Sequence, residues 1–197
     1  MADKELDQGK RRFLLTTTSV ATGVAAGAAG VPFVLSMMPS ERAKAAGAPV
    51  EVDVSALEPG QKMVVEWRGK PVWVVRRTPE MLKMVSSDQD RVADPASARS
   101  EQPTYAKNEM RSLKPEYLVV VGICTHLGCS PVDRLAAQSE PFASDWHGGF
   151  YCPCHGSLFD LAGRVYKNKP APDNLTVPPY RFVGDTKLII GEDTQGA

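Results

Sequence analysis

The sequence predicts a mostly β domain that carries one N-terminal transmembrane helix. From Val50 onward, short runs alternate apolar and polar side chains, and Pro and Gly, 16 of each, supply turns between strands. No charged residue occurs from Phe13 to Met38. As a helix, this run would span about 39 Å, more than the roughly 30 Å hydrocarbon core of a bilayer. Basic and acidic residues are equal at 23 each, which argues against nucleic-acid binding.

The residues before the apolar run indicate export. Lys10, Arg11 and Arg12 precede it and are followed by Phe-Leu-Leu, a pattern that resembles a twin-arginine signal, which carries folded proteins. The positive-inside rule then places the N-terminus in the cytoplasm and the globular part outside. The stretch Ala-Lys-Ala-Ala at residues 43–46 offers an alternative, a signal cleavage site, but the length of the run favours a retained anchor.

The composition divides the chain in two. Residues 1–48 are expected to comprise the cytoplasmic N-terminus, the anchor and a short linker, rich in small and polar residues, that would be flexible. Residues 49–197 are expected to form the globular domain. Strands are predicted at 50–54, 62–67, 71–76, 118–123 and within 176–190, with turns at 69–70 and 184–185. Residues 79–114 are expected to begin as a helix and continue as an irregular insertion.

Two short motifs contain all the cysteines and two of the three histidines. The first holds Cys124, His126 and Cys129, and the second holds Cys152, Cys154 and His155. Thiolate and imidazole together suit zinc or an iron–sulfur cluster rather than Mg²⁺ or Ca²⁺. The third histidine, His147, lies outside both motifs and is interpreted as a turn residue.

Local geometry suggests how these six groups are divided. Side chains two residues apart in an extended loop point to one side, so Cys124 and His126 can reach one centre, and a turn lets Cys152 and His155 do the same. Cys129 and Cys154 are left, and outside the cytoplasm two such thiols are expected to form a disulfide. A zinc ribbon is the alternative, although zinc loops usually present C-x-x-C pairs without spare cysteines.

The two motifs, C-T-H-L-G-C and C-P-C-H-G-S, resemble those of the Rieske family, in the form found in cytochrome bc complexes. This resemblance implies a Rieske-type antiparallel β-sandwich with an inserted cluster-binding subdomain at about residues 118–172. It also implies one [2Fe-2S] cluster, with Cys124 and Cys152 on one iron, His126 and His155 on the other, and a disulfide between Cys129 and Cys154.

The same resemblance implies the function. The protein would take electrons from quinol, with proton release, and pass them through a high-potential cluster to a c-type cytochrome. His155 would contact quinol, and Leu127 with the turn Pro170–Pro172 would dock on cytochrome b. The expected setting is a dimeric bc1 complex in a bacterial inner membrane, with a single-pass anchor and the Rieske domain on the periplasmic side. The alternatives are the small Rieske subunit of another exported oxidoreductase, such as an arsenite oxidase, and a soluble Rieske ferredoxin, which would lack the anchor and the extra cysteines.

Three positions bear on the environment of the cluster. Ser157 supplies a hydroxyl donor in the family, whereas Phe159 stands where many bc-type members carry a tyrosine that donates to a ligand sulfur. Lys169 precedes Pro170 where relatives usually have glycine, so the resemblance does not imply the exact geometry of this turn.

Overall fold

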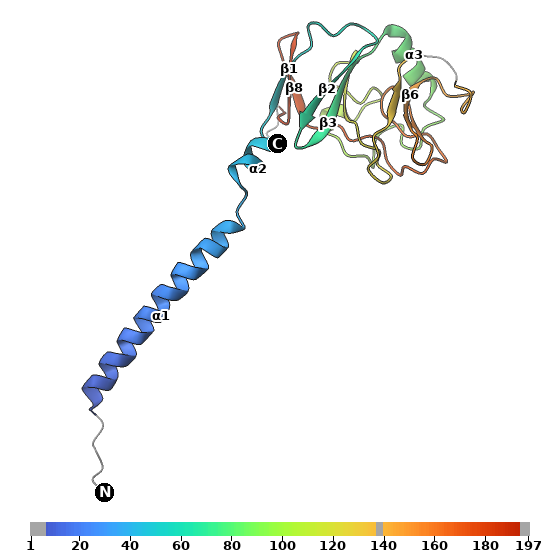
Figure 1. Cartoon of the computed structure of the whole chain (residues 1–197). Helices are drawn as coiled ribbons and strands as arrows, with labels where there is room; N and C mark the ends of the chain where they lie inside the picture. The colour runs from blue at the N-terminus through green and yellow to red at the C-terminus, as the bar shows by residue number, and fades with distance from the viewer. Residues whose placement is uncertain (1–6, 137–139, 194–197) are drawn as a thin grey trace. The chain divides into compact units, whose positions relative to one another are not determined.

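A computed structural model describes residues 7–136 and 140–193, and the first six residues of the predicted cytoplasmic N-terminus lie outside this part. The chain separates into two compact units, Met1–Lys44 and Ala45–Ala197 (Figure 1). Each unit is considered by itself below.

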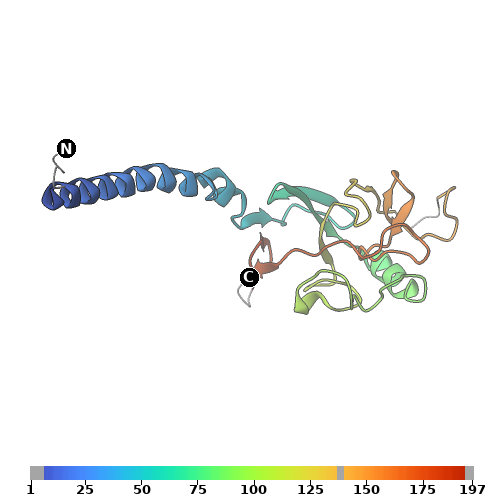
Figure 2. The same ribbon diagram turned by 90° about the horizontal axis from the view of Figure 1, so that it is seen from below.

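The first unit is dominated by one long helix, α1, which spans Gln8–Ser36 (Figures 1 and 2). Asp7 caps its N-terminus, because its side chain accepts hydrogen bonds from the backbone N–H groups of Gly9 and Lys10. Within the described residues, the one helical segment long and apolar enough to cross a membrane is Gln8–Ala45, which contains α1 and has a mean hydropathy of 1.7. The expected linker contains a short helix, α2, at Glu41–Ala46, where Ser40 Oγ accepts from the N–H of Ala43 at 3.2 Å.

The second unit is built mainly from strands, which form three antiparallel sheets of three strands each. The first sheet orders β1 (Val50–Asp53), β9 (Lys187–Ile190) and β8 (Tyr180–Val183). The second orders β2 (Lys62–Trp67), β3 (Lys70–Arg76) and β4 (Tyr117–Val121), and the third orders β5 (Val132–Arg134), β6 (Gly149–Cys152) and β7 (Ser157–Phe159). The remaining elements are α3 (Pro79–Ser87) and a 3-10 turn, η1 (Thr104–Ala106).

The predicted strands agree with the sheets at most positions. The range predicted for β2 matches, and β3 begins one residue earlier than expected. The strand expected from residue 176 begins only at Tyr180, and the two residues before it are Pro178 and Pro179, which have no N–H to donate to a sheet. The short strands β5–β7 were not predicted, because turn residues and metal motifs interrupt their pattern.

Aromatic packing joins the second sheet to the third, which carries the cysteine motifs. Trp73 on β3 stacks on Phe150 of β6, with ring centroids 5.1 Å apart. Gly122 makes room for this indole, since a Cβ there would lie 2.2 Å from the Trp73 ring. Lys62 on β2 pairs with Asp133 on β5. These contacts fix the strand that enters the first motif relative to the hairpin that holds the second.

Candidate metal centre

The first cysteine motif forms a tight loop directly after β4. The backbone N–H of Cys124 donates to the carbonyl of Cys129 at 2.8 Å, and that of Gly128 donates to the carbonyl of Cys124 at 3.1 Å. Gly128 has a φ of +84°, a conformation that a side chain would strain. Leu127 is therefore presented at the tip of the loop, where 72% of it is exposed.

The second motif is the turn between β6 and β7. Cys152 and Ser157 are paired across this hairpin, and the N–H of Gly156 donates to the carbonyl of Cys152 at 3.0 Å. Cys152 and Ser157 are buried, whereas Cys154 and His155 between them are exposed. The hairpin thus holds one thiol inside and presents one imidazole outside.

The fold brings the two loops together. Cys129 and Cys154 form a disulfide with their Cα atoms 6.7 Å apart, as predicted. Cys124 and Cys152 remain free thiols and are buried. The rings of His126 and His155 meet edge to face with centroids 4.6 Å apart. The sulfur of Cys152 lies within 4.8 Å of the sulfurs of Cys129 and Cys154. Those two sulfurs are bonded to each other, so they are not available as thiolate ligands for a metal.

The donor set fits an iron–sulfur cluster. His126 Nδ1 is buried and has no hydrogen-bond partner among the described residues, which suits a nitrogen whose lone pair binds a metal. Burial raises the pKa of the Cys124 thiol, and a metal ion bound there would stabilise its thiolate. Two thiols and two imidazoles are the ligands of a Rieske centre, in which imidazoles replace two thiolates on one iron.

A third segment lies against both loops. The N–H of Ala171, which lies between the two prolines of the Pro170–Pro172 turn, donates to Ser157 Oγ at 3.0 Å. Thr125 Oγ1 donates to the carbonyl of Asp173 at 2.6 Å. Sequence reasoning named the Pro170–Pro172 turn but missed Thr125 and Asp173, since no pattern in the sequence pairs a threonine with a distant carbonyl.

The sequence analysis also named Pro170, Pro172 and Phe159. Pro170 and Pro172 are exposed. Phe159 is fully buried, in the same hydrophobic cluster as Cys124 and Cys152.

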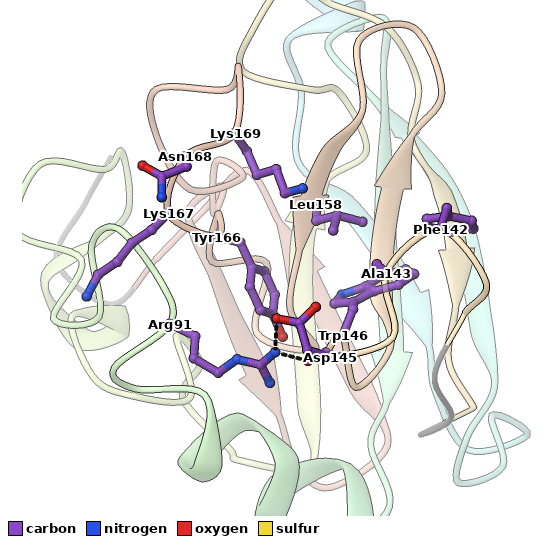
Figure 3. Close-up of a pocket in the computed structure, with 10 residues that line it drawn as sticks. All are labelled: Arg91, Phe142, Ala143, Asp145, Trp146, Leu158, Tyr166, Lys167, Asn168 and Lys169. Carbon is purple, nitrogen blue, oxygen red and sulfur yellow. Dashed lines mark hydrogen bonds and ion pairs between the residues drawn. The ribbon is translucent and has the colours of Figure 1, made fainter.

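A pocket of about 340 Å³ lies beside the segment that leads into the turn, and none of the residues that line it is a predicted ligand (Figure 3). Lys169 belongs to its lining, and an ion pair of 2.8 Å joins Arg91 to Asp145 there. The buried carboxylate of Asp88 accepts from the Tyr166 hydroxyl at 2.5 Å and lies 2.9 Å from His147 Nδ1. His147 therefore belongs to this second group of residues.

Comparison with known proteins decides the family. The Rieske [2Fe-2S] domain family matches residues 49–180. The chain belongs to the Rieske [2Fe-2S] family. A second family, described as "Ubiquitinol-cytochrome C reductase Fe-S subunit TAT signal", matches residues 1–40 of this Rieske protein.

Several bacterial relatives of the Rieske protein carry the same name. The ubiquinol-cytochrome c reductase iron-sulfur subunit of Allochromatium vinosum is 56% identical over 100% of this chain and 95% of its own length. That of Bradyrhizobium diazoefficiens is 43% identical over 92% of this chain and 94% of its own. A chain in the solved structure of a hyperthermophilic respiratory Complex III is 27% identical, over 87% of this chain and 98% of that one, with a TM-score of 0.49.

These matches confirm several predictions. The fold is the Rieske-type antiparallel β-fold with one N-terminal helix, and the cofactor is one [2Fe-2S] cluster rather than zinc. The twin-arginine signal is confirmed as a family match, and together with the apolar helix it fits an exported, membrane-anchored Rieske domain.

Proposed function

We propose that this Rieske protein is the iron–sulfur subunit of a cytochrome bc1 complex and transfers electrons from ubiquinol to a c-type cytochrome. The observation that carries this proposal is the 56% identity, along the whole chain, to a ubiquinol-cytochrome c reductase iron-sulfur subunit. The partners are then cytochrome b and a c-type cytochrome in a dimeric complex. Residues 1–48 anchor the protein in the bacterial inner membrane, and residues 49–197 form the domain on the periplasmic side.

The ligand set follows from the geometry of the two loops. We assign Cys124 and Cys152 to one iron and His126 and His155 to the other, because these thiols are free and buried and these rings meet. The bound cluster supplies a one-electron acceptor whose potential lies above that of plant-type ferredoxins, since neutral imidazoles replace two thiolates.

His155 is the residue placed to meet the substrate. Its ring is exposed, whereas His126 is half-buried. The unpartnered Nδ1 of His126 is the nitrogen that would bind iron in that ring. If His155 binds through the same nitrogen, its Nε2 is free to accept the proton of a quinol hydroxyl. Leu127, Pro170 and Pro172 are exposed apolar residues, and they are the side chains we expect to dock on cytochrome b.

Purification from the membrane tests the proposal. A tagged full-length chain should co-purify with a cytochrome b and a c-type cytochrome, and the preparation should reduce cytochrome c with ubiquinol. The dithionite-reduced protein should give a Rieske EPR signal. The alternative, a subunit of an exported oxidoreductase such as arsenite oxidase, predicts a molybdenum subunit instead, and that result would overturn the proposal.

Ser157→Ala should lower the midpoint potential of the cluster. Ser157 is buried and pairs with Cys152 across the hairpin, so we expect its hydroxyl to donate to a sulfur of the cluster site, and such bonds stabilise the more negative, reduced state. A net bond of about 1 kcal/mol corresponds to roughly 40 mV for one electron. Redox titration monitored by EPR measures the shift, and Ser130→Ala on the first loop, whose hydroxyl contacts the Gly122 carbonyl, is the matched control. A potential equal to that of the control would contradict the expectation.

Phe159→Tyr should raise the potential by a similar amount, roughly 40 mV. Phe159 is fully buried, so the added hydroxyl needs a partner, and the Cys124 sulfur is the acceptor we expect. Phe182→Tyr, on β8 of another sheet, serves as the control. An unchanged or lowered midpoint in Phe159→Tyr, with the cluster intact, would show that this position does not tune the centre.

A further inference from the structure

The pocket that contains Lys169 is lined by aromatic side chains that the metal centre does not use. Trp146 and Tyr166 are buried, at 0% and 6% exposure (Figure 3). Phe142 also lines the pocket, but half of it is exposed, and its ring stacks on Tyr151 with centroids 4.5 Å apart. A hollow that combines buried aromatic residues with an exposed one is a typical place for contact with another molecule.

The residues around this pocket are held in place by a buried carboxylate. Asp88 accepts hydrogen bonds from the Tyr166 hydroxyl at 2.5 Å and from the Arg91 guanidinium at 3.0 Å. The backbone N–H of Lys167 donates to the carbonyl of Arg91 at 2.9 Å. Because these contacts join segments that are far apart in the chain, the pocket is preformed, and a molecule that enters it does not have to order it first.

The charges around the pocket favour an anionic group. Three cationic side chains line it, together with one carboxylate, that of Asp145. Arg91 is paired with this carboxylate at 2.8 Å, and Lys167 Nζ donates to the uncharged backbone carbonyl of Asp90 at 2.6 Å. Lys169 makes no hydrogen bond or ion pair with any residue that the structure describes. Among the described residues, the charges of both lysines therefore lack a paired anion, and a carboxylate is a group that they would attract.

Lys169 lies where the pocket meets the expected docking surface. It directly precedes Pro170, and both residues are exposed. In Figure 3 its ammonium group lies beside Leu158, whereas the side chains of Lys167 and Asn168 point away from Leu158. A protein that rests on Pro170 would therefore meet Lys169 one residue earlier in the chain. We expect the same protein to supply the anionic group.

We propose that the pocket receives an acidic side chain of cytochrome b, whose carboxylate pairs with Lys169 while apolar atoms beside it pack on Phe142. The inference rests on the proposed function, which names cytochrome b as the protein that Leu127, Pro170 and Pro172 contact. A charge pair at the edge of an interface mainly fixes orientation and speeds association, rather than adding affinity. The pocket thus gives the docked Rieske domain one rotational setting, which apolar contacts alone do not specify because they are non-directional.

Removing the charge of Lys169 tests the proposal in the assembled complex. Lys169→Met keeps a long, unbranched side chain and loses the charge, whereas Lys169→Arg keeps the charge and is the matched control. At low ionic strength, the complex with Lys169→Met should reduce cytochrome c with ubiquinol about threefold more slowly than the complex with Lys169→Arg, and the difference should shrink as salt screens the pair. The midpoint potential of the cluster should be the same in both variants. Equal rates, or a difference that salt does not change, would overturn the proposal.

A zero-length cross-link identifies the partner in the unmodified complex. A carbodiimide joins a lysine to a carboxylate only where the two groups are in contact, and peptide mass spectrometry should find Lys169 linked to an acidic residue of cytochrome b. Lys83, an exposed lysine on α3 that does not line the pocket, is the control and should give no such link. Linkage of Lys169 to the c-type cytochrome instead, or no link from Lys169, would overturn the proposal. Failure of the proposed function looks different, since the chain would then not co-purify with cytochrome b.

Discussion

His155→Ala should abolish the [2Fe-2S] cluster while leaving the anchor in the membrane. The change removes a nitrogen ligand from a preformed site, and the loss of affinity should exceed the ~10–100-fold that removing an outer hydrogen-bond partner costs. The reduced-cluster EPR signal and the bound iron should both disappear, and the protein should still be detected in the membrane fraction by immunoblotting. The anchor persists because α1 belongs to the other compact unit of the chain.

His147→Ala is the control for this experiment. His147 is a partly exposed histidine of the same domain, and its Nδ1 contacts Asp88. When His147 is replaced, Asp88 still has Tyr166 and Arg91 as hydrogen-bond partners. This variant should retain the cluster and its spectrum. A normal reduced-cluster signal in His155→Ala would show that the ligand assignment is wrong.

Replacing both Cys129 and Cys154 by serine should weaken retention of the cluster without changing its ligands. The disulfide links loops that are 25 residues apart in the chain, and removing such a bridge from a small exported domain typically costs ~2–5 kcal/mol. The cluster should be lost at a lower urea concentration than in the unmodified protein, while the EPR g-values of the remaining cluster indicate the same two-cysteine, two-histidine set. The single variants are less suitable, because each leaves one reactive thiol.

Two observations would contradict the role of the bridge. If mass spectrometry of the native protein finds Cys129 and Cys154 as free thiols, the disulfide does not contribute to retention of the cluster. Equal resistance of the serine variant and the unmodified protein to urea would show that the loops are held by other contacts alone.

The sequence predicted the disulfide and the meeting of the two cysteine motifs because the pattern that indicates them is local. A cysteine and a histidine two or three residues apart can reach one metal whatever the rest of the chain does, and the spare cysteines then find each other. The anchor is predictable for the same reason, since membrane crossing depends on a continuous apolar run. These features need no information about distant partners.

Contacts between distant segments could not be predicted in this way. Residues 79–114 were expected to be an irregular insertion, yet Arg111 from this segment is fully buried and donates to the carbonyls of Ala162, Gly163 and Leu175. In a sequence, a charged residue within a polar stretch indicates an exposed side chain. The Arg111 guanidinium can be buried because carbonyl groups from other segments accept its hydrogen bonds. The bond from Ala171 to Ser157 is hidden for a similar reason, because its donor is backbone and carries no side-chain signature.

The disulfide also constrains the order in which the protein matures. Disulfides form in oxidising compartments, whereas a twin-arginine signal delivers a chain that has already folded around its cofactor. The two loops must therefore enclose the cluster while Cys129 and Cys154 are still reduced, held by noncovalent contacts such as Thr125 to Asp173. Oxidation then joins two thiols that the assembled centre has already aligned. We therefore expect the disulfide to form after translocation, once the cluster is in place.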